Sequence, residues 1–197
     1  MANLKLKNPS GGSLNLVSAD SASDLTLTFP AGTGTAVVNG INSSIVSGTA
    51  VASTSGTSID FTSIPNWVKR ITVVFNGVSG SGTSALLVQL GTGSTTFTTS
   101  GYAATASYTD TATNLVTSTA GFPIFTNSAS YGFSGSMVIA NISGNTWVAN
   151  HSGANSTGYS NNGGGNVSLG ATLTAVRITR VNGTDTFDAG SINILYE

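Results

Sequence analysis

Ile59-Asp-Phe-Thr-Ser-Ile-Pro-Asn-Trp-Val-Lys-Arg-Ile-Thr-Val-Val-Phe-Asn-Gly-Val78 is the stretch that decides the fold of this chain. It opens with a short strand signal, turns at Pro65-Asn66, and continues as a long segment in which apolar residues alternate with polar ones. Such alternation is typical of a strand with one buried face. We expect the buried face to carry Trp67, Ile71, Val73 and Phe75. Lys69 lies on the same face by its spacing.

The same alternation returns in short segments up to the end of the chain. Turns rich in Gly, Ser, Thr and Asn separate these segments, and no helical period appears. Many short strands with such turns predict an all-β, jelly-roll-like antiparallel β-sandwich. The expected strands are Ser58–Thr62, Trp67–Val78, Ala85–Leu90, Gly121–Phe125, Phe133–Ile142, Thr146–His151, Ala171–Val181 and Ser191–Tyr196.

Two Gly-containing turns predict hairpins, one within Ile142–Thr146 and one around Asn182-Gly183. Between the predicted strands, residues 94–120 are rich in Thr, Ala and Tyr and show little pattern. We interpret them as a surface excursion, the kind of segment on which binding residues often lie.

The chain divides into three parts by pattern. Residues 1–40 predict an extended N-terminal β arm, residues 41–57 an extended linker or first edge strand, and residues 58–197 the sandwich. Short apolar strands without a covering helix are marginal in water, so the arm needs a partner for anchoring or trimer formation. Its expected contact residues are Leu4, Leu6, Leu14, Leu16, Leu25, Leu27 and Phe29.

The composition is unusually poor in charge. Charged residues make up 7% of the chain and the net charge is -1, whereas roughly 25% is usual for a soluble domain. A neutral, hydroxyl-rich surface suits a protein held in an assembly, and it gives no basic footprint for nucleic acid. No apolar run of about 18 residues is present, so we expect no membrane-spanning helix.

The sequence does not predict an enzyme or a cofactor. Cysteine is absent, which removes disulfides, thiolate metal sites and a Cys nucleophile. His151 is the only histidine, so a His-based metal triad cannot form, and we interpret it as a hydrogen-bonded or rim residue on the face of Trp147 and Ala149.

Two pairs of acidic residues have alternative readings. Asp185 and Asp188 suit a Ca²⁺ site with backbone carbonyls, but turn capping by Asp185 and pairing of Asp188 with Arg177 or Arg180 is the simpler reading. Asp60 and Asp110 are the acidic pair that a glycosidase would need, although their separation in space does not follow from the sequence. Because the simpler reading of Asp185 and Asp188 is structural, we predict no metal site.

Saccharide binding is the better-founded ligand hypothesis, because aromatic rings and neutral amides suit sugars through stacking and hydrogen bonds. Residues 150–166 have the adaptable polar composition of a recognition loop. The candidate glycan- or receptor-binding residues are Tyr102, Tyr108, His151, Asn155, Tyr159 and Asn161.

Two stretches resemble parts of bacteriophage tail-fibre and related virion proteins. Ile59–Val78, together with Phe187-Asp-Ala-Gly-Ser-Ile-Asn-Ile-Leu-Tyr-Glu197, is similar to a C-terminal module of these proteins. Residues 12–38, with their Phe29-Pro30 step followed by Gly-Thr, resemble a short repeat of the same class. Residues 83–182 carry no such likeness.

The resemblance implies a virion structural protein that is assembled in the host cytoplasm. A short homotrimeric tail or head fibre is expected, with residues 1–40 against other virion proteins and the sandwich facing outward toward a host surface saccharide. The chain departs from long fibres because no shaft separates arm and sandwich. A capsid decoration or cement protein therefore stays open, as does a glycan-processing enzyme that uses Asp60 or Asp110.

Overall fold

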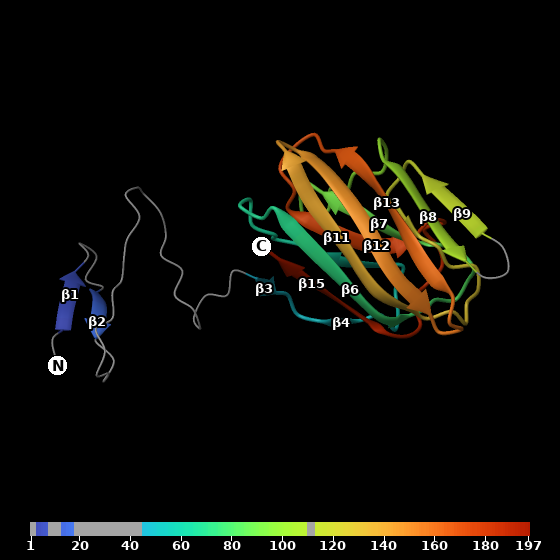
Figure 1. Ribbon diagram of the computed structural model, residues 1–197, viewed down its shortest axis with the longest axis horizontal. Coiled ribbons are helices and arrows are strands. Elements are labelled where there is room, and N and C mark those ends of the chain that lie inside the picture. The colour runs from blue at the N-terminus through green and yellow to red at the C-terminus, as the bar shows by residue number, and fades with distance from the viewer. Residues whose placement is uncertain (1–2, 8–12, 18–44, 110–112) are drawn as a thin grey trace. The chain divides into compact units, whose positions relative to one another are not determined.

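The computed structural model describes residues 3–7, 13–17, 45–109 and 113–197, and the chain divides into two units, Met1–Asn42 and Ser43–Glu197 (Figure 1). Every regular element within these ranges is a strand, and every paired neighbour is antiparallel. The predicted all-β antiparallel class is therefore confirmed, while the jelly-roll connectivity stays a prediction. The described residues contain no helix long and apolar enough to cross a membrane.

The described part of the N-terminal unit is a hairpin of β1 (Asn3–Lys7) and β2 (Ser13–Val17). Its register sets Leu4 opposite Leu16 and Leu6 opposite Leu14. The other three predicted anchoring residues, Leu25, Leu27 and Phe29, lie outside the described residues. The backbone pairing thus agrees with the alternation in the sequence, and the anchoring role stays a prediction.

The larger sheet of the second unit holds nine strands in the order β3-β15-β6-β11-β12-β13-β8-β9, with β4 also paired to β15. Figure 1 shows its long strands β6, β11, β12 and β13 side by side. Their bounds are β3 (Val46–Ser47), β4 (Val51–Ala52), β6 (Arg70–Val78), β8 (Ala103–Thr109), β9 (Thr113–Ser118), β11 (Phe133–Ser143), β12 (Thr146–Asn155), β13 (Ser160–Ser168) and β15 (Ser191–Tyr196).

The smaller sheet holds four strands in the order β10-β7-β14-β5. One buried cluster joins residues of both sheets, so the two sheets pack face to face as a sandwich. Ile71 and Ile139 contribute from the larger sheet, and Val88 and Ile178 from the smaller one. The bounds are β5 (Ser58–Phe61), β7 (Leu86–Gly91), β10 (Phe122–Ile124) and β14 (Ala175–Arg180).

The opening stretch is partly corrected. Ile71, Val73 and Phe75 are buried on β6 as expected, but Trp67 is 52% exposed. The reason is that β6 begins at Arg70, and Trp67 lies in the preceding turn, where strand alternation does not apply. Val68 takes the buried place that the alternation assigned to its neighbour.

Two segments expected to be loops are strands. Residues 94–120 contain β8 and β9, and residues 150–166 belong mostly to β12 and β13, which form a hairpin. The sequence did not predict these strands because their side chains are mostly small, and Ala, Ser, Thr and Gly give a weak apolar pattern. A Cβ on Gly165 would lie 2.3 Å from the carbonyl oxygen of Ala103 on β8, so the glycine permits a close backbone approach.

The segment expected as linker or edge strand is joined to the sandwich. β3 and β4 both pair with β15, and the buried Ser53 donates from Oγ to the carbonyl of Ala189 at 2.8 Å. The sandwich unit therefore starts before residue 58, and the edge-strand reading describes residues 46–52.

Of the two predicted hairpins, the first is confirmed by the pairing of Ser143 with Thr146, with Gly144 at a φ of 51°. The turn at Asn182-Gly183 forms, with Gly183 at a φ of 70°. It is not a hairpin, because β14 belongs to the smaller sheet and the next strand, β15, to the larger one.

Candidate functional site

Most of the residues predicted to bind saccharide are buried. Five of them are buried and one, Tyr159, is partly exposed. Because a buried ring or amide offers no surface to a sugar, the prediction that these six residues form a recognition surface is wrong for the five. The buried residues are Tyr102, Tyr108, His151, Asn155 and Asn161.

Tyr108 and Tyr159 are brought together in a row of aromatic rings. The Tyr108 ring centroid lies 4.6 Å from that of Phe125 and 5.7 Å from that of Tyr159, which is 6.3 Å from Tyr131. Asn127 donates from Nδ2 to the Tyr108 hydroxyl at 2.8 Å. Tilted ring contacts of this kind stabilise packing, so the row holds the segment after β10 against β8 and the β12–β13 turn.

His151 and Asn161 form a buried polar pair between neighbouring strands β12 and β13. The side-chain Nδ2 of Asn161 donates to the carbonyl of Phe125 at 2.5 Å, which leaves Asn161 Oδ1 to accept from His151 Nε2 at 3.0 Å. This assigns the proton to Nε2, and Nδ1 has no hydrogen-bond partner. Burial lowers the pKa of His151, although the hydrogen bond that it donates to Asn161 opposes the shift. The imidazole is therefore neutral at pH 7 and structural.

Asn155 builds the turn between β12 and β13. Its Oδ1 accepts from the amide of Thr157 at 3.2 Å, from the Thr157 hydroxyl at 2.7 Å and from the amide of Tyr159 at 3.0 Å. Local side-chain bonding of this kind is why Asn is favoured in turns. With every bond directed inward to the turn, Asn155 has a structural role.

Tyr102 is fixed against the smaller sheet. Its hydroxyl oxygen accepts from the amide of Leu90 at 2.8 Å, and its ring meets Phe122 edge-on at 5.0 Å. Burial raises the pKa of Tyr102 to about 12, so the hydroxyl stays protonated at all physiological pH values.

The outer face of the smaller sheet carries a groove of about 320 Å³, a volume at the small end of the range for ligand sites. It crosses β5, β14 and β7 and reaches the turn at Asn182-Gly183. Its lining includes Thr57, Ser58, Leu87, Gln89, Ala120, Arg177, Thr179, Val181, Asn182 and Gly183. Hydroxyl, amide and guanidinium groups thus dominate its polar chemistry.

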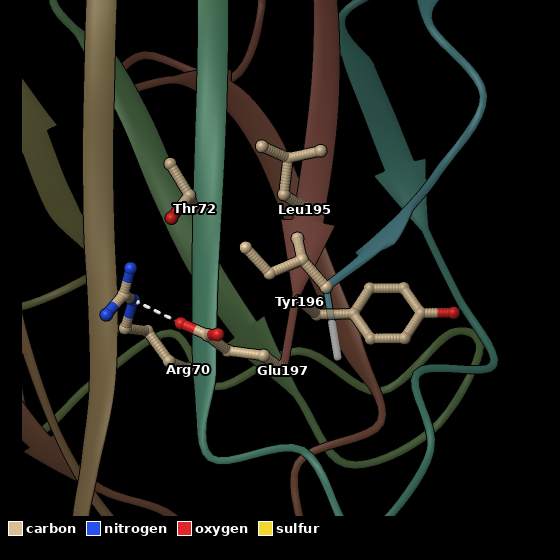
Figure 2. Close-up of a pocket in the computed structure, with 6 residues that line it drawn as sticks. Arg70, Thr72, Leu195, Tyr196 and Glu197 are labelled. Carbon is tan, nitrogen blue, oxygen red and sulfur yellow. Dashed lines mark ion pairs between the residues drawn. The ribbon is translucent and has the colours of Figure 1, made fainter. Parts of the chain in front are cut away.

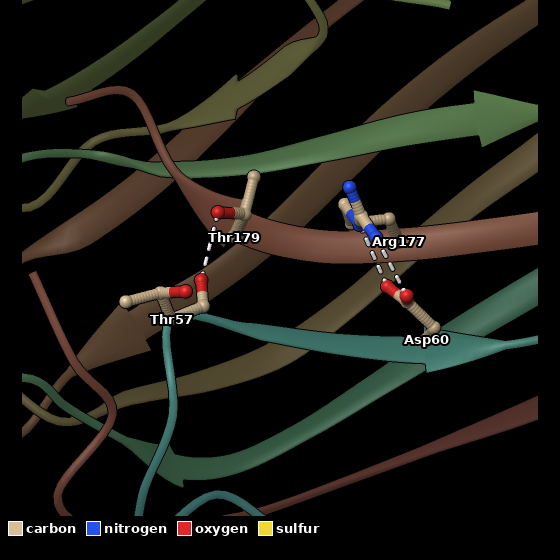
Figure 3. Close-up of polar contacts among 4 residues, drawn as sticks. All are labelled: Thr57, Asp60, Arg177 and Thr179. Atoms are coloured by element: carbon tan, nitrogen blue, oxygen red, sulfur yellow. Dashed lines mark hydrogen bonds and ion pairs between the residues drawn. The ribbon is translucent and has the colours of Figure 1, made fainter. Parts of the chain in front are cut away.

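Contacts between β5 and β14 hold polar side chains at the groove in place (Figure 3). Arg177 donates from Nε and Nη2 to the two carboxylate oxygens of Asp60 at 2.8 and 2.7 Å, and this hydrogen bonding raises the pKa of Arg177. The guanidinium carbon also lies 4.0 Å from the centroid of the Phe97 ring. Nearby, Thr179 donates from Oγ1 to the carbonyl of Thr57 at 2.8 Å.

Gln89 supplies the buried wall of the groove. Its Nε2 donates to the carbonyl of Ala120 at 2.9 Å, which fixes the amide plane. The side chain alternates with the core residues Val88 and Leu90 on β7, so it faces away from the sandwich core. Sequence reasoning missed this site. The available signal was the polar position of Asp60 between Ile59 and Phe61 on its strand.

A second, smaller hollow of about 60 Å³ lies where β15 meets β6 (Figure 2). Arg70 and Glu197 form an ion pair of 2.9 Å there, with Thr72 and Leu195 beside it. The exposed Trp67 ring lies 5.9 Å from that of Tyr196, close to this end of the strands. The hollow is too small for a ligand beyond a few water molecules.

Asp185 and Asp188 each have a hydrogen-bond partner within the sandwich unit. Asp185 accepts from the amide of Ser84 at 3.1 Å, while its pKa is lowered first by its hydrogen bond with Asn182. Asp188 accepts from the hydroxyl of Ser79. No group of three His, Cys, Asp or Glu residues suited to a metal occurs within the described ranges.

Asp60 is engaged by Arg177, which therefore does not pair with Asp188. Asp110, its proposed catalytic partner, lies outside the described residues. The structure thus gives Asp60 a role in an ion pair. Comparison of the chain with protein-family models, with curated proteins and with solved structures finds no match.

Proposed function

We propose that this chain is a structural protein of a bacteriophage virion, held in the particle by its N-terminal unit and presenting the sandwich outward. The observation that carries the proposal is the division of the chain at Asn42 and Ser43. The described part of the first unit is one two-stranded sheet. Since such a hairpin is marginal alone in water, sister chains or another virion protein supply the packing that it needs.

The sandwich unit has the properties of a displayed domain. Its two sheets share one buried core, and every described residue of that core lies in the second unit. One cross-strand row of the larger sheet shows the surface chemistry: Val74, Ser136, Ser152 and Asn162 lie in register on neighbouring strands. All four are uncharged and at least partly exposed. A neutral surface of this kind suits a protein that is held in an assembly and does not rely on charge repulsion for its solubility.

The specific form that we propose is a short homotrimeric fibre on tail or head. It rests on the likeness of Ile59–Val78, Phe187–Glu197 and residues 12–38 to fibre proteins. Ile59–Val78 and Phe187–Glu197 supply β5, β6 and β15 of the sandwich, so they form part of its framework.

Deletion of residues 2–40 tests the anchoring role. The truncated chain is expected to keep a cooperative unfolding transition, because the sandwich core lies wholly in the second unit. It is also expected to be missing from purified particles produced in cells that supply it in place of the full chain. Normal incorporation of the truncated chain would contradict the proposal.

Capsid decoration is the second candidate, favoured because the sequence shows no shaft segment between residues 1–40 and the sandwich. Copy number separates the two forms. A fibre is present in few copies for each particle, whereas a decoration protein approaches the copy number of the shell protein.

A further inference from the structure

The groove on the outer face of the smaller sheet offers many unused hydrogen-bonding positions. Arg177 has five N–H donors, and two of its nitrogens point one hydrogen each at Asp60. The Asp60 carboxylate has further lone pairs beyond those two bonds. Both side chains remain about 30% exposed, at 31% and 28%. Arg177, which lines the groove, can therefore donate to a ligand while it stays paired with Asp60, which is not one of the lining residues.

The charge of this surface is balanced. The Arg177 guanidinium is offset by the Asp60 carboxylate at 2.7 Å. Arg180 also borders the groove, but it follows the core residue Ile178 at alternate spacing and is 2% exposed. Its Nη1 donates to the carbonyl of Ser84 at 2.9 Å. The described groove lining thus presents no exposed, unpaired cation to an anionic ligand.

The polar groups are held in place before any ligand arrives. The Phe97 ring packs on the guanidinium plane, Asp60 fixes its direction, and Gln89 is anchored to the carbonyl of Ala120. Arg177 and Thr179 also project from the central strand of three that are hydrogen-bonded together. Preorganised donors and acceptors lower the entropic cost of binding.

We propose that this groove binds a neutral saccharide. Sugar hydroxyls both donate and accept, which matches the less buried polar groups of the lining: the hydroxyls of Thr57 and Ser58, the Asn182 amide and the paired Arg177 guanidinium. Charge-assisted hydrogen bonds from Arg177 are the strong ones among these. The inference goes beyond the structural role proposed above. It places the ligand on β5, β7 and β14, away from the buried residues that the sequence suggested, and it holds whether or not the chain is part of a virion.

Titration of the full-length protein by nuclear magnetic resonance tests the proposal. The probes are neutral oligosaccharides of glucose, galactose and mannose, with an oligosaccharide of glucuronate as the acidic counterpart. At least one neutral probe at millimolar concentration is expected to shift the amide signals of Gln89, Thr179 and Gly183. The Arg177→Lys variant should bind roughly tenfold more weakly, because it loses the planar donor fork.

Arg70→Lys is the matched control, since Arg70 forms the other surface ion pair of the described residues, on the larger sheet. It should leave binding unchanged. If Arg177→Lys does not fold, Asp60→Asn replaces it and should weaken binding similarly. The proposal is overturned if no neutral probe shifts these signals, if shifts occur only elsewhere, if the acidic probe binds more tightly, or if Arg70→Lys weakens binding equally. None of these outcomes alters the expected result of the deletion experiment on particles.

Discussion

Arg177 on β14 and Asp60 on β5 lie directly opposite each other and share two parallel hydrogen bonds of 2.8 and 2.7 Å. This cross-strand pair joins an edge strand of the smaller sheet to its neighbour, and the Phe97 ring covers the guanidinium. Arg177 of this pair also lines the proposed groove. The same contact therefore has consequences for stability and for ligand binding.

A double-mutant cycle with Asp60→Asn and Arg177→Met should give a coupling energy of about 0.5–1 kcal/mol. The pair is bidentate and partly shielded, which places it at the upper end of surface ion pairs. The same cycle with Glu197→Gln and Arg70→Met should give less than about 0.5 kcal/mol, because Arg70 is more exposed. Urea unfolding of the seven proteins measures both values, and an equal or reversed order would contradict the assignment.

The stability of the protein should depend on the protonation of His151. Burial lowers the pKa of this histidine in the folded state below the unfolded value of 6.5, so the unfolded chain takes up the proton first as pH falls. The stabilisation is complete above pH 6.5 and is lost as pH decreases toward the folded pKa, with a slope of at most about 1.4 kcal/mol per pH unit.

His151→Asn tests this origin, since His151 is the only histidine in the chain. The variant is expected to be less stable at pH 7 but to show a flatter dependence of the unfolding free energy between pH 7 and 5.5. A slope equal to that of the unchanged protein would assign the effect to other groups.

Core and surface positions of the opening stretch should respond differently to truncation. Ile71→Ala removes a fully buried side chain and should cost about 2–5 kcal/mol in unfolding free energy. Trp67→Ala removes a larger side chain but should cost less than about 1 kcal/mol, because the ring is half exposed and contacts Tyr196 at the surface. If denaturant unfolding shows that the two variants lose equal unfolding free energy, the assignment of Trp67 to the surface is contradicted.

The glycines of β13 should be intolerant of side chains where the backbones approach closely. Gly165→Ala places a Cβ 2.3 Å from the carbonyl oxygen of Ala103 and should cost about 1–3 kcal/mol. Gly170→Ala is the control, because nothing lies within 4 Å of its Cβ position, and it should be neutral or stabilising by up to about 1 kcal/mol. Thermal unfolding of the two variants compares them; similar stability would contradict the close packing of β13 against β8.

Strands with large apolar residues could be predicted from the sequence. Ile192 and Ile194 on β15 show the simple alternation that burial of one face requires, and the predicted strand has the observed bounds. By contrast, β8 and β13 have few such residues, because Ala104, Ala106, Gly163 and Gly165 occupy most inner positions of closely spaced backbones. An alternating pattern of large apolar side chains cannot predict strands whose close pairing depends on Ala and Gly.

The candidate site was harder to predict than the fold. Asn and Tyr in residues 150–166 have the composition of a recognition loop, but Asn155 and Asn161 form hydrogen bonds with backbone groups of the protein and are buried. Conversely, Asp60 and Arg177 are 117 positions apart, and only the pairing of β5 with β14 brings them together. Register between distant strands is not encoded in the local spacing of residues.

The central claim, that this chain is a virion structural protein, is tested most directly by mass spectrometry of gradient-purified phage particles that carry its coding sequence. The account predicts that the full chain is present at a fixed ratio to the major shell protein and stays with the particles through repeated purification. Absence of the chain from such particles, while it is abundant in the lysed cells, would contradict the account.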